Sequence, residues 1–257
     1  MNMKKIIYLM MGVALISVTS CMETDNWDAP DARIYGTVID EYTNAPLLTD
    51  QNDWQIRIWE RSWTASTPQY QDLPVKADGT YNNSKLFAGT YDMVPHDGPF
   101  WEPAESEIVT GVVFKSGGST KQDFRVKPYL QILDFDYTLG AVGADGKANL
   151  TLRCKLRAPI TEGFDVREVR PFLSLTVFCG NSSKIDIPEY NDRRVDVNKN
   201  WNDVLSTFGG SGDTSDIIEM GPLPVKSGYT YHVRVGANTN KGNNRYNYSE
   251  IKEFKVP

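Results

Sequence analysis

The sequence predicts an all-β protein with two β-sandwich domains in tandem, residues 33–127 and 128–257, after an N-terminal leader. Short runs in which apolar and polar residues alternate recur along the chain, and such alternation is typical of half-buried strands. Glycine, proline, asparagine and aspartate separate these runs as turn residues, and only one short segment has a helical period. A chain of 257 residues is long enough to form two such cores.

Residues 1–20 have the composition of a cleaved secretory signal peptide. Two lysines precede an apolar run, 6–18, that is too short for a comfortable membrane span. The segment Val18-Thr19-Ser20-Cys21 resembles the lipobox of bacterial lipoproteins. That resemblance implies that Cys21 becomes the lipidated first residue of the mature chain. An ordinary signal peptide and an uncleaved anchor are the alternatives.

Residues 21–32 contain the lipidated cysteine and an acidic linker without a periodic pattern. In some bacterial lipoproteins an acidic stretch after the cysteine accompanies export to the outer face of the cell. Glu23 and Asp25 suit that pattern, although a plain solvated linker has the same composition. We therefore expect a protein that is lipid-anchored in the outer membrane and faces the cell exterior.

The net charge argues against nucleic acid as a partner. The formal charge of the whole chain is −6, and Lys4 and Lys5 are the only charged residues of the signal peptide. The mature chain therefore has 25 basic and 33 acidic residues, a net charge of −8. An acidic chain without a dense basic tract is unsuited to nucleic acid or to an anionic membrane surface. The lipid, rather than charge, is expected to hold the protein at the membrane.

Two cysteines remain after Cys21, and both Cys154 and Cys179 lie in strand-like runs. In an exported chain they could form a disulfide. We favour the alternative, in which two buried thiols pack as small hydrophobic groups. The chain has no CxxC pair and only two histidines, so a His-rich catalytic metal site is excluded. Neither a metal nor a cofactor is expected.

Strands of the first domain are expected in five short segments. These are residues 33–40, 55–59, 89–94, 108–114 and 120–126. Asp78-Gly79 is a hairpin-type turn pattern. Ser116-Gly117-Gly118-Ser119 predicts a hairpin loop between the last two strands.

A motif in this domain resembles the carboxypeptidase-regulatory or transthyretin-like β-sandwich. The motif consists of Gly36-x-Val38-x-Asp40-x-x-Thr43-x-x-Pro46-Leu47, Asp78-Gly79-x-Tyr81 and Leu86-x-x-Gly89-x-Tyr91. The resemblance covers residues 33–127 and implies a structural or binding domain without a specific activity. Residues 50–74 depart from a minimal module because they are longer and richer in tryptophan.

The second domain begins after Lys127-Pro128, and its strands are more regular. Residues 148–156 alternate cleanly, which predicts a strand with one buried face. The buried face would contain Ala148, Leu150, Leu152, Cys154 and Leu156. Residues 169–179 are more continuously apolar and predict another strand. Residues 201–208 predict a small amphipathic helix that plugs the sandwich.

Residues 223–239 resemble the late strands of a fibronectin type III domain, and residues 248–256 resemble its closing strand. Tyr231 lies three residues after Gly228, at the position of the tyrosine in a tyrosine corner. The resemblance implies that the Tyr231 hydroxyl bonds to backbone a few residues upstream.

Catalytic motifs are absent from the sequence. It has no GxSxG elbow, P-loop, HExxH, or GxGxxG after a strand. Glu102, Glu105 and Glu107 could serve a glycoside hydrolase only if two of them faced each other across a cleft, and a solvated rim is favoured. Two aspartate pairs could contribute oxygen ligands to calcium, although their spacing matches no calcium loop. These pairs are Asp134/Asp136 and Asp213/Asp216.

Aromatic side chains in the longer loops of the first domain give the main functional prediction. Flat rings stack on the C–H faces of sugars, and several rings among Asn, Asp and Gln form a carbohydrate platform. The candidate carbohydrate-binding residues are Trp59, Trp63, Tyr70, Phe100 and Trp101. The alternative is that these rings close the ends of a small sandwich, which is favoured for Trp54 and Trp59.

In domain order, the chain resembles two-domain surface lipoproteins of gut Bacteroidota that are encoded beside the paired porin and lid lipoprotein of glycan uptake systems. That resemblance implies a non-catalytic accessory protein that binds a polysaccharide or oligosaccharide. One alternative is an adaptor docked on outer-membrane transporter components, which predicts buried tryptophans and an apolar patch elsewhere. The other is a glycoside hydrolase, which predicts a deep cleft with a perturbed carboxyl group.

Overall fold

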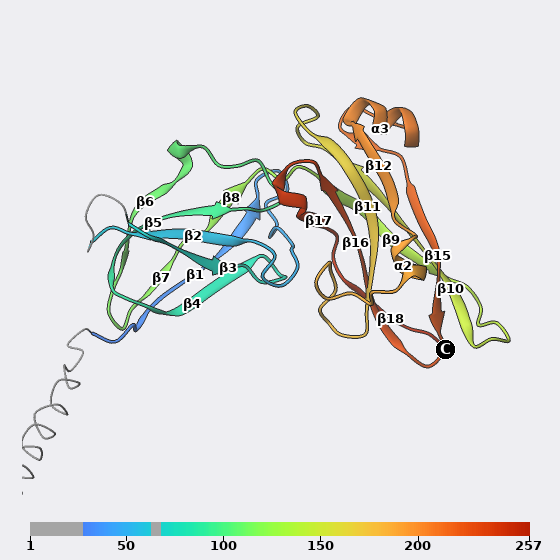
Figure 1. Ribbon diagram of the computed structural model, residues 1–257, viewed down its shortest axis with the longest axis horizontal. Helices are drawn as coiled ribbons and strands as arrows, with labels where there is room; N and C mark the ends of the chain where they lie inside the picture. The colour runs from blue at the N-terminus through green and yellow to red at the C-terminus, as the bar shows by residue number, and fades with distance from the viewer. Residues whose placement is uncertain (1–27, 63–67) are drawn as a thin grey trace, which may run out of the picture. The chain divides into compact units, whose positions relative to one another are not determined.

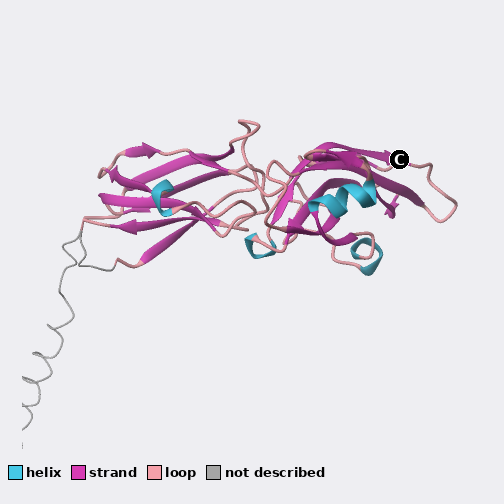
Figure 2. Cartoon of the chain, turned by 90° about the horizontal axis from the view of Figure 1, so that it is seen from above, coloured by secondary structure: helices cyan, strands magenta, loops and turns pink. Residues whose placement is uncertain are grey.

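The computed structural model describes residues 28–62 and 68–257, and it confirms the all-β prediction. Within these residues the strands form four sheets that build two sandwiches, and helices are few and short (Figure 1). Figure 2 shows the same dominance of strands from a second direction. Among the described helices, none combines the length and apolar character needed to cross a bilayer.

The N-terminal sandwich contains strands β1 to β8 and a 3-10 helix, η1. Their bounds are β1 (Ala32–Asp40), β2 (Gln55–Glu60), β3 (Tyr70–Pro74), β4 (Thr80–Leu86), β5 (Gly89–His96), η1 (Glu105–Glu107), β6 (Val109–Phe114), β7 (Ser119–Lys121) and β8 (Phe124–Val126). One sheet has the order β4–β1–β7, with β8 also paired to β1, and the other has the order β3–β2–β5–β6.

The predicted hairpin at residues 116–119 is wrong, because the strands on its two sides belong to different sheets. β6 pairs with β5, whereas β7 and β8 pair in parallel with β1. β4 occupies one edge of the nine-residue strand β1, and β7 and β8 complete the other edge. The Asp78-Gly79 turn likewise connects strands of different sheets, β3 and β4.

Aromatic side chains fill much of the N-terminal core. Trp54 is 0% exposed, and its ring meets the Phe100 ring edge-on, with centroids 5.1 Å apart. Tyr91 stacks on Phe114 with centroids 4.2 Å apart. The structure thus confirms the core position favoured for Trp54.

The C-terminal sandwich contains strands β9 to β18 with three short helices. Their bounds are β9 (Gln131–Leu139), β10 (Lys147–Arg157), β11 (Asp165–Ser174), α2 (Pro188–Asn191), β12 (Val195–Asn200), α3 (Trp201–Phe208), β13 (Gly210–Ser211), β14 (Thr214–Ser215), β15 (Ile218–Lys226), β16 (Thr230–Thr239), η2 (Gly242–Asn244), β17 (Tyr246–Tyr248) and β18 (Lys252–Lys255). One sheet has the order β13–β14–β10–β15 with β9 also on β10, and the other has the order β12–β11–β16–β17 with β18 also on β16.

The core of this sandwich confirms the predicted alternation in β10. Every second side chain of the strand is buried, and the five predicted core residues are each at most 1% exposed. The predicted helix at 201–208 is also present as α3, with Trp201 and Val204 buried. Asn200 caps it by accepting a hydrogen bond from the Asp203 amide. The Trp201 indole donates to the Gly212 carbonyl, which fixes the helix to the loop that follows it.

The prediction of a strand over residues 169–179 is wrong at both ends, because β11 begins at Asp165 and ends at Ser174. The Ser174 hydroxyl accepts a hydrogen bond from the Thr176 amide at 3.1 Å, a local turn that competes with continued pairing. Leu175, Val177 and Phe178 therefore leave the sheet and are 51, 62 and 44% exposed.

The two cysteines described by the structure are free buried thiols, as favoured from the sequence. Cys154 lies in the core between the sheets, whereas Cys179 packs with Phe172, Tyr246 and Tyr248 in a separate cluster. Each cysteine is 1% exposed.

We predict that neither thiol reacts in the native protein at about pH 8, because only the exposed thiolate is an effective nucleophile. Burial raises the pKa of Cys154 and of Cys179 to about 12. A chain of residues 22–257 contains the whole compact unit 31–257, so it suits the test. Iodoacetamide should leave its intact mass unchanged in native buffer and modify both thiols in guanidinium. Rapid labelling of the native chain would contradict this burial.

Candidate functional site

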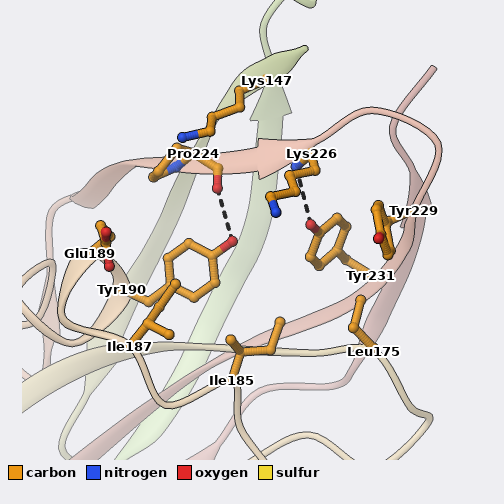
Figure 3. A pocket seen from close by; sticks show the side chains of 10 residues that line it. All are labelled: Lys147, Leu175, Ile185, Ile187, Glu189, Tyr190, Pro224, Lys226, Tyr229 and Tyr231. Atoms are coloured by element: carbon orange, nitrogen blue, oxygen red, sulfur yellow. Dashed lines mark hydrogen bonds between the residues drawn. The ribbon is translucent and has the colours of Figure 1, made fainter. Parts of the chain in front are cut away.

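A pocket of about 490 Å³ lies beside β15 at the edge of the C-terminal sandwich (Figure 3). Among the described strands β15 pairs with β10 alone, so its other edge is open. The chain from residue 185 to α2 passes along that edge and forms one side of the pocket. An irregular segment placed against an open strand edge prevents further strand pairing and leaves room for a ligand.

Tyr231, at the start of β16, forms part of the pocket floor and occupies the predicted tyrosine corner. Its hydroxyl accepts a hydrogen bond from the Lys226 backbone N–H at 3.1 Å, which confirms the predicted bond to upstream backbone. Gly228, with φ of 83°, supplies the left-handed turn between β15 and β16. The Tyr231 ring stacks on Phe254 with centroids 5.7 Å apart. The position of this ring is therefore fixed by the fold.

Tyr190, on α2, is the second residue of the floor. Pro188 begins α2, where a fixed φ suits the first helical position. The Tyr190 hydroxyl donates to the Pro224 carbonyl of β15 at 2.9 Å, which attaches α2 to the strand edge. Burial raises the pKa of Tyr190 above its usual range, so this hydroxyl stays neutral. We call Tyr190 and Tyr231, which are 6% and 4% exposed, the tyrosine floor.

Three aliphatic side chains, Leu175, Ile185 and Ile187, line the pocket opposite β15, and we call them the aliphatic wall (Figure 3). The Ile185 amide donates to the Leu173 carbonyl at 2.7 Å, which ties the wall to the end of β11. Tyr229 lies at one end of the pocket and is 50% exposed. Its ring is therefore the aromatic surface of the pocket that is most open to a ligand.

Charged side chains lie around the opening. Lys147 begins β10 and Lys226 ends β15, and both are exposed. Figure 3 shows Lys226 pointing into the pocket toward the tyrosine floor, and Glu189 at the end opposite Tyr229. Glu189 is the one carboxylate among the lining residues.

The pocket is suited to non-covalent binding of a small polar ring. An open aromatic ring and an aliphatic wall offer apolar contact, while the amines and the carboxylate offer directional hydrogen bonds. Glycoside hydrolysis ordinarily uses two carboxyl groups that flank the bond. The single carboxylate among the lining residues does not supply that pair.

The structure uses two of the sequence-predicted platform residues for packing. Phe100 is 1% exposed in the N-terminal core, so its ring has no open face for a sugar. An isolated antiparallel β-bridge joins Phe100 to Pro128 and holds the loop that contains Phe100 against the next segment. Trp101 is half-buried and packs on Tyr129 and Phe164, with ring centroids 5.0 and 6.2 Å away.

The other predicted residues have different surroundings. Trp59 and Tyr70 are brought together as direct neighbours across β2 and β3, with Trp59 half-buried and Tyr70 56% exposed. The Arg57 guanidinium lies 3.7 Å from the centroid of the Tyr70 ring and covers one of its faces. Trp63 and the lipidation residue Cys21 lie outside the described residues.

Two of the three carboxylates considered for hydrolysis form local hydrogen bonds. Glu102 bonds to His96 Nδ1 at 3.1 Å, and Glu107 accepts from the Ala104 amide at 2.7 Å. Glu102 and Glu107 also line a pocket with Trp101, but its volume is about 80 Å³. That volume is well below the roughly 300 Å³ at which ligand pockets begin.

Three of the four aspartates considered for calcium bind basic side chains instead. The pairs are Asp134 with Lys155 at 2.9 Å, Asp136 with Arg153 at 2.8 Å, and Asp213 with Arg157 at 2.6 Å. These carboxylates therefore serve cross-strand and loop pairing in the structure.

No pattern in the sequence marks the pocket residues Tyr190, Tyr229, Lys147 and Lys226 as a site. The position of Tyr229 beside Gly228 is a usable signal, because an aromatic residue next to a turn is often exposed. The lysines, in contrast, meet only through the register of β10 on β15. Register between strands that are distant in the sequence is not visible in either strand alone.

Comparisons with known proteins give a family match for the N-terminal sandwich and a fold for the chain. Residues 32–127 match the family described as "Protein of unknown function (DUF3823) N-terminal domain". No curated protein sequence matches the chain. A solved "putative carbohydrate binding protein" from Bacteroides uniformis is 22% identical, with a TM-score of 0.67, covering 88% of this chain and 100% of its own.

Two solved DUF3823 family proteins have the same architecture. One, from Bacteroides uniformis, is 23% identical with a TM-score of 0.62, and one, from Parabacteroides merdae, is 21% identical with a TM-score of 0.60. Each covers 89% of this chain and 100% of its own. These matches define a class of β-rich, two-domain Bacteroidota proteins. Residues 32–127 of the chain are therefore similar in sequence to the DUF3823 N-terminal domain, and the whole chain shares the fold of these proteins.

We predict that Tyr231→Phe lowers the free energy of unfolding by about 1–3 kcal/mol, because the Lys226 amide loses its acceptor inside the protein. Tyr229→Phe is the matched control, since the Tyr229 ring is half exposed and the change should stay within about 0.5 kcal/mol. Urea unfolding of residues 22–257 measures both. Equal stability of the two variants would show that the tyrosine corner does not hold the pocket floor.

Proposed function

We propose that the chain is a non-catalytic lipoprotein of the outer membrane that faces the cell exterior and binds polysaccharide or oligosaccharide for a glycan uptake system. The pocket beside β15 is the sugar site. The main observation in favour is a half-exposed ring, Tyr229, next to the aliphatic wall in a volume of about 490 Å³. That volume falls within the range of small-molecule sites.

The chemistry of the pocket fits a sugar ring. A pyranose has apolar C–H faces and polar edges, and it gains most where an aromatic face and hydrogen-bonding groups are both present. Tyr229 and the aliphatic wall supply the apolar contact, and Glu189 and the lysines supply the polar contacts. The solved relative from Bacteroides uniformis whose description names carbohydrate binding supports this ligand class. The lipobox-like residues 18–21 and the acidic linker support attachment to the outer membrane.

The test is isothermal calorimetry of residues 22–257 against a panel of plant, host and microbial oligosaccharides. We expect at least one ligand to bind, and Tyr229→Ala to weaken it about tenfold, since stacking on the ring is lost. Tyr70→Ala is the matched control, because Tyr70 is also an exposed tyrosine but lies on the N-terminal sandwich. Loss of binding with Tyr70→Ala alone would move the sugar site to the Trp59–Tyr70 surface.

An adaptor that docks on outer-membrane transporter components is the second candidate function. The exposed side chains of Leu175, Val177 and Phe178 favour it, because adjacent exposed apolar groups mark contact surfaces. In that case no oligosaccharide in the panel would bind. The full-length chain would co-purify with a transporter component from detergent-solubilised outer membranes, and Val177→Ser with Phe178→Ser would abolish this association.

A further inference from the structure

Two lysines occupy paired positions at the opening of the pocket. Lys147 and Lys226 are direct partners in the antiparallel pairing of β10 and β15. Residues that are directly opposite in such a pair have Cβ atoms about 4.5–5.5 Å apart, and like charges at that spacing repel each other. Both side chains are exposed and line the same pocket. The pairing therefore concentrates positive charge at one place on an acidic chain.

Neither lysine has an ion-pair partner within the described part of the chain. Other basic side chains of the same sheet do form ion pairs. Arg153 of β10 is directly opposite Asp136 of β9 and binds it at 2.8 Å. Lys155 of the same strand binds Asp134 at 2.9 Å. The pair at the pocket thus departs from the charge matching seen elsewhere along β10.

We propose that Lys147 and Lys226 bind an anionic group, a carboxylate or a sulfate ester, on the sugar that occupies the pocket. This inference rests on the proposed function and names the class of glycan, an acidic one. An anion between the two amines removes their repulsion and accepts charge-assisted hydrogen bonds from both. The tyrosine floor lies beneath the Lys226 amine (Figure 3).

Glu189 sets the orientation of the acidic sugar. It lies at the end of the pocket beside Tyr190, whereas Lys226 lies toward the Tyr231 end (Figure 3). A carboxylate there repels the anionic group and accepts hydrogen bonds from neutral hydroxyls. The pocket thus offers the Lys226 amine toward Tyr231 for the anion and the Glu189 carboxylate beside Tyr190 for sugar hydroxyls. The net charge of −8 on the mature chain, from 25 basic and 33 acidic residues, opposes non-specific attraction of polyanions, so binding of an acidic glycan would depend on this local pair.

The experiment compares three ligands on residues 22–257 by calorimetry: an oligomer of a uronic acid, the same oligomer with its carboxyl groups reduced to alcohols, and a sulfated neutral oligosaccharide. We expect the carboxylated or the sulfated ligand to bind, and the reduced ligand to bind at least about tenfold more weakly than the uronic acid oligomer if the anion is a carboxylate. The sulfated arm identifies the anion as a sulfate if it alone binds.

Lys147→Gln and Lys226→Gln should each weaken binding of the acidic ligand about tenfold. In the unmodified chain, binding of the same ligand should become weaker as the salt concentration rises. Without ligand the same variants should be at least as stable as the unmodified chain, because a repulsion is removed. Lys115→Gln is the matched control, since it removes an exposed lysine outside the pocket. It should change neither property.

Two results would overturn the inference, and they can be told apart. If neutral ligands bind as tightly as acidic ones and the lysine variants bind like the unmodified chain, the acidic class is wrong while the sugar site stands. If no ligand of any class binds, the proposed function fails and the inference fails with it.

Discussion

Strand β16 is buried on both faces, and the C-terminal sandwich is arranged around it. Tyr231 and Val233 belong to the core between the sheets, whereas Arg234 points to the other face and is 1% exposed. Its guanidinium lies 3.6 Å from the centroid of the Tyr248 ring and donates to the Thr49 carbonyl at 2.9 Å. Burial lowers the pKa of Arg234 from its usual value. A buried cation is tolerated only with such partners, so this strand requires cover on both sides.

The geometry of the pocket depends on the turn that precedes β16 and on the first residues of that strand. Tyr231 enters the core at the start of β16, and its hydroxyl holds the Lys226 amide. The backbone of Lys226 is therefore fixed while its side chain remains exposed at the pocket. Tyr229 lies two residues before Tyr231 and is exposed, because it precedes the buried part of β16. A rigid floor with exposed groups at its margin requires little ordering when a ligand binds.

Local patterns were sufficient to predict much of the fold. The alternation of β10, the helix α3 and the corner at Tyr231 each depend on residues near one another in the sequence, and the structure contains all three. The predicted hairpin at 116–119 and the predicted end of β11 fail because pairing partners and local turns decide them. The burial of Phe100 and the pairing of Lys147 with Lys226 depend on contacts between distant segments. A single sequence does not show such contacts.

Exposed tyrosines on the two sandwiches differ in what a ligand would have to displace. Arg57 covers the ring of Tyr70, and Asp72 binds that guanidinium through two hydrogen bonds of 2.8 and 2.9 Å. A sugar that stacks on the covered face would have to break this arrangement first. Among the described residues no cation covers the Tyr229 ring, and an open volume lies beside it. Because stacking on the open side of Tyr229 displaces no ion-paired guanidinium, the second sandwich offers the more favourable surface.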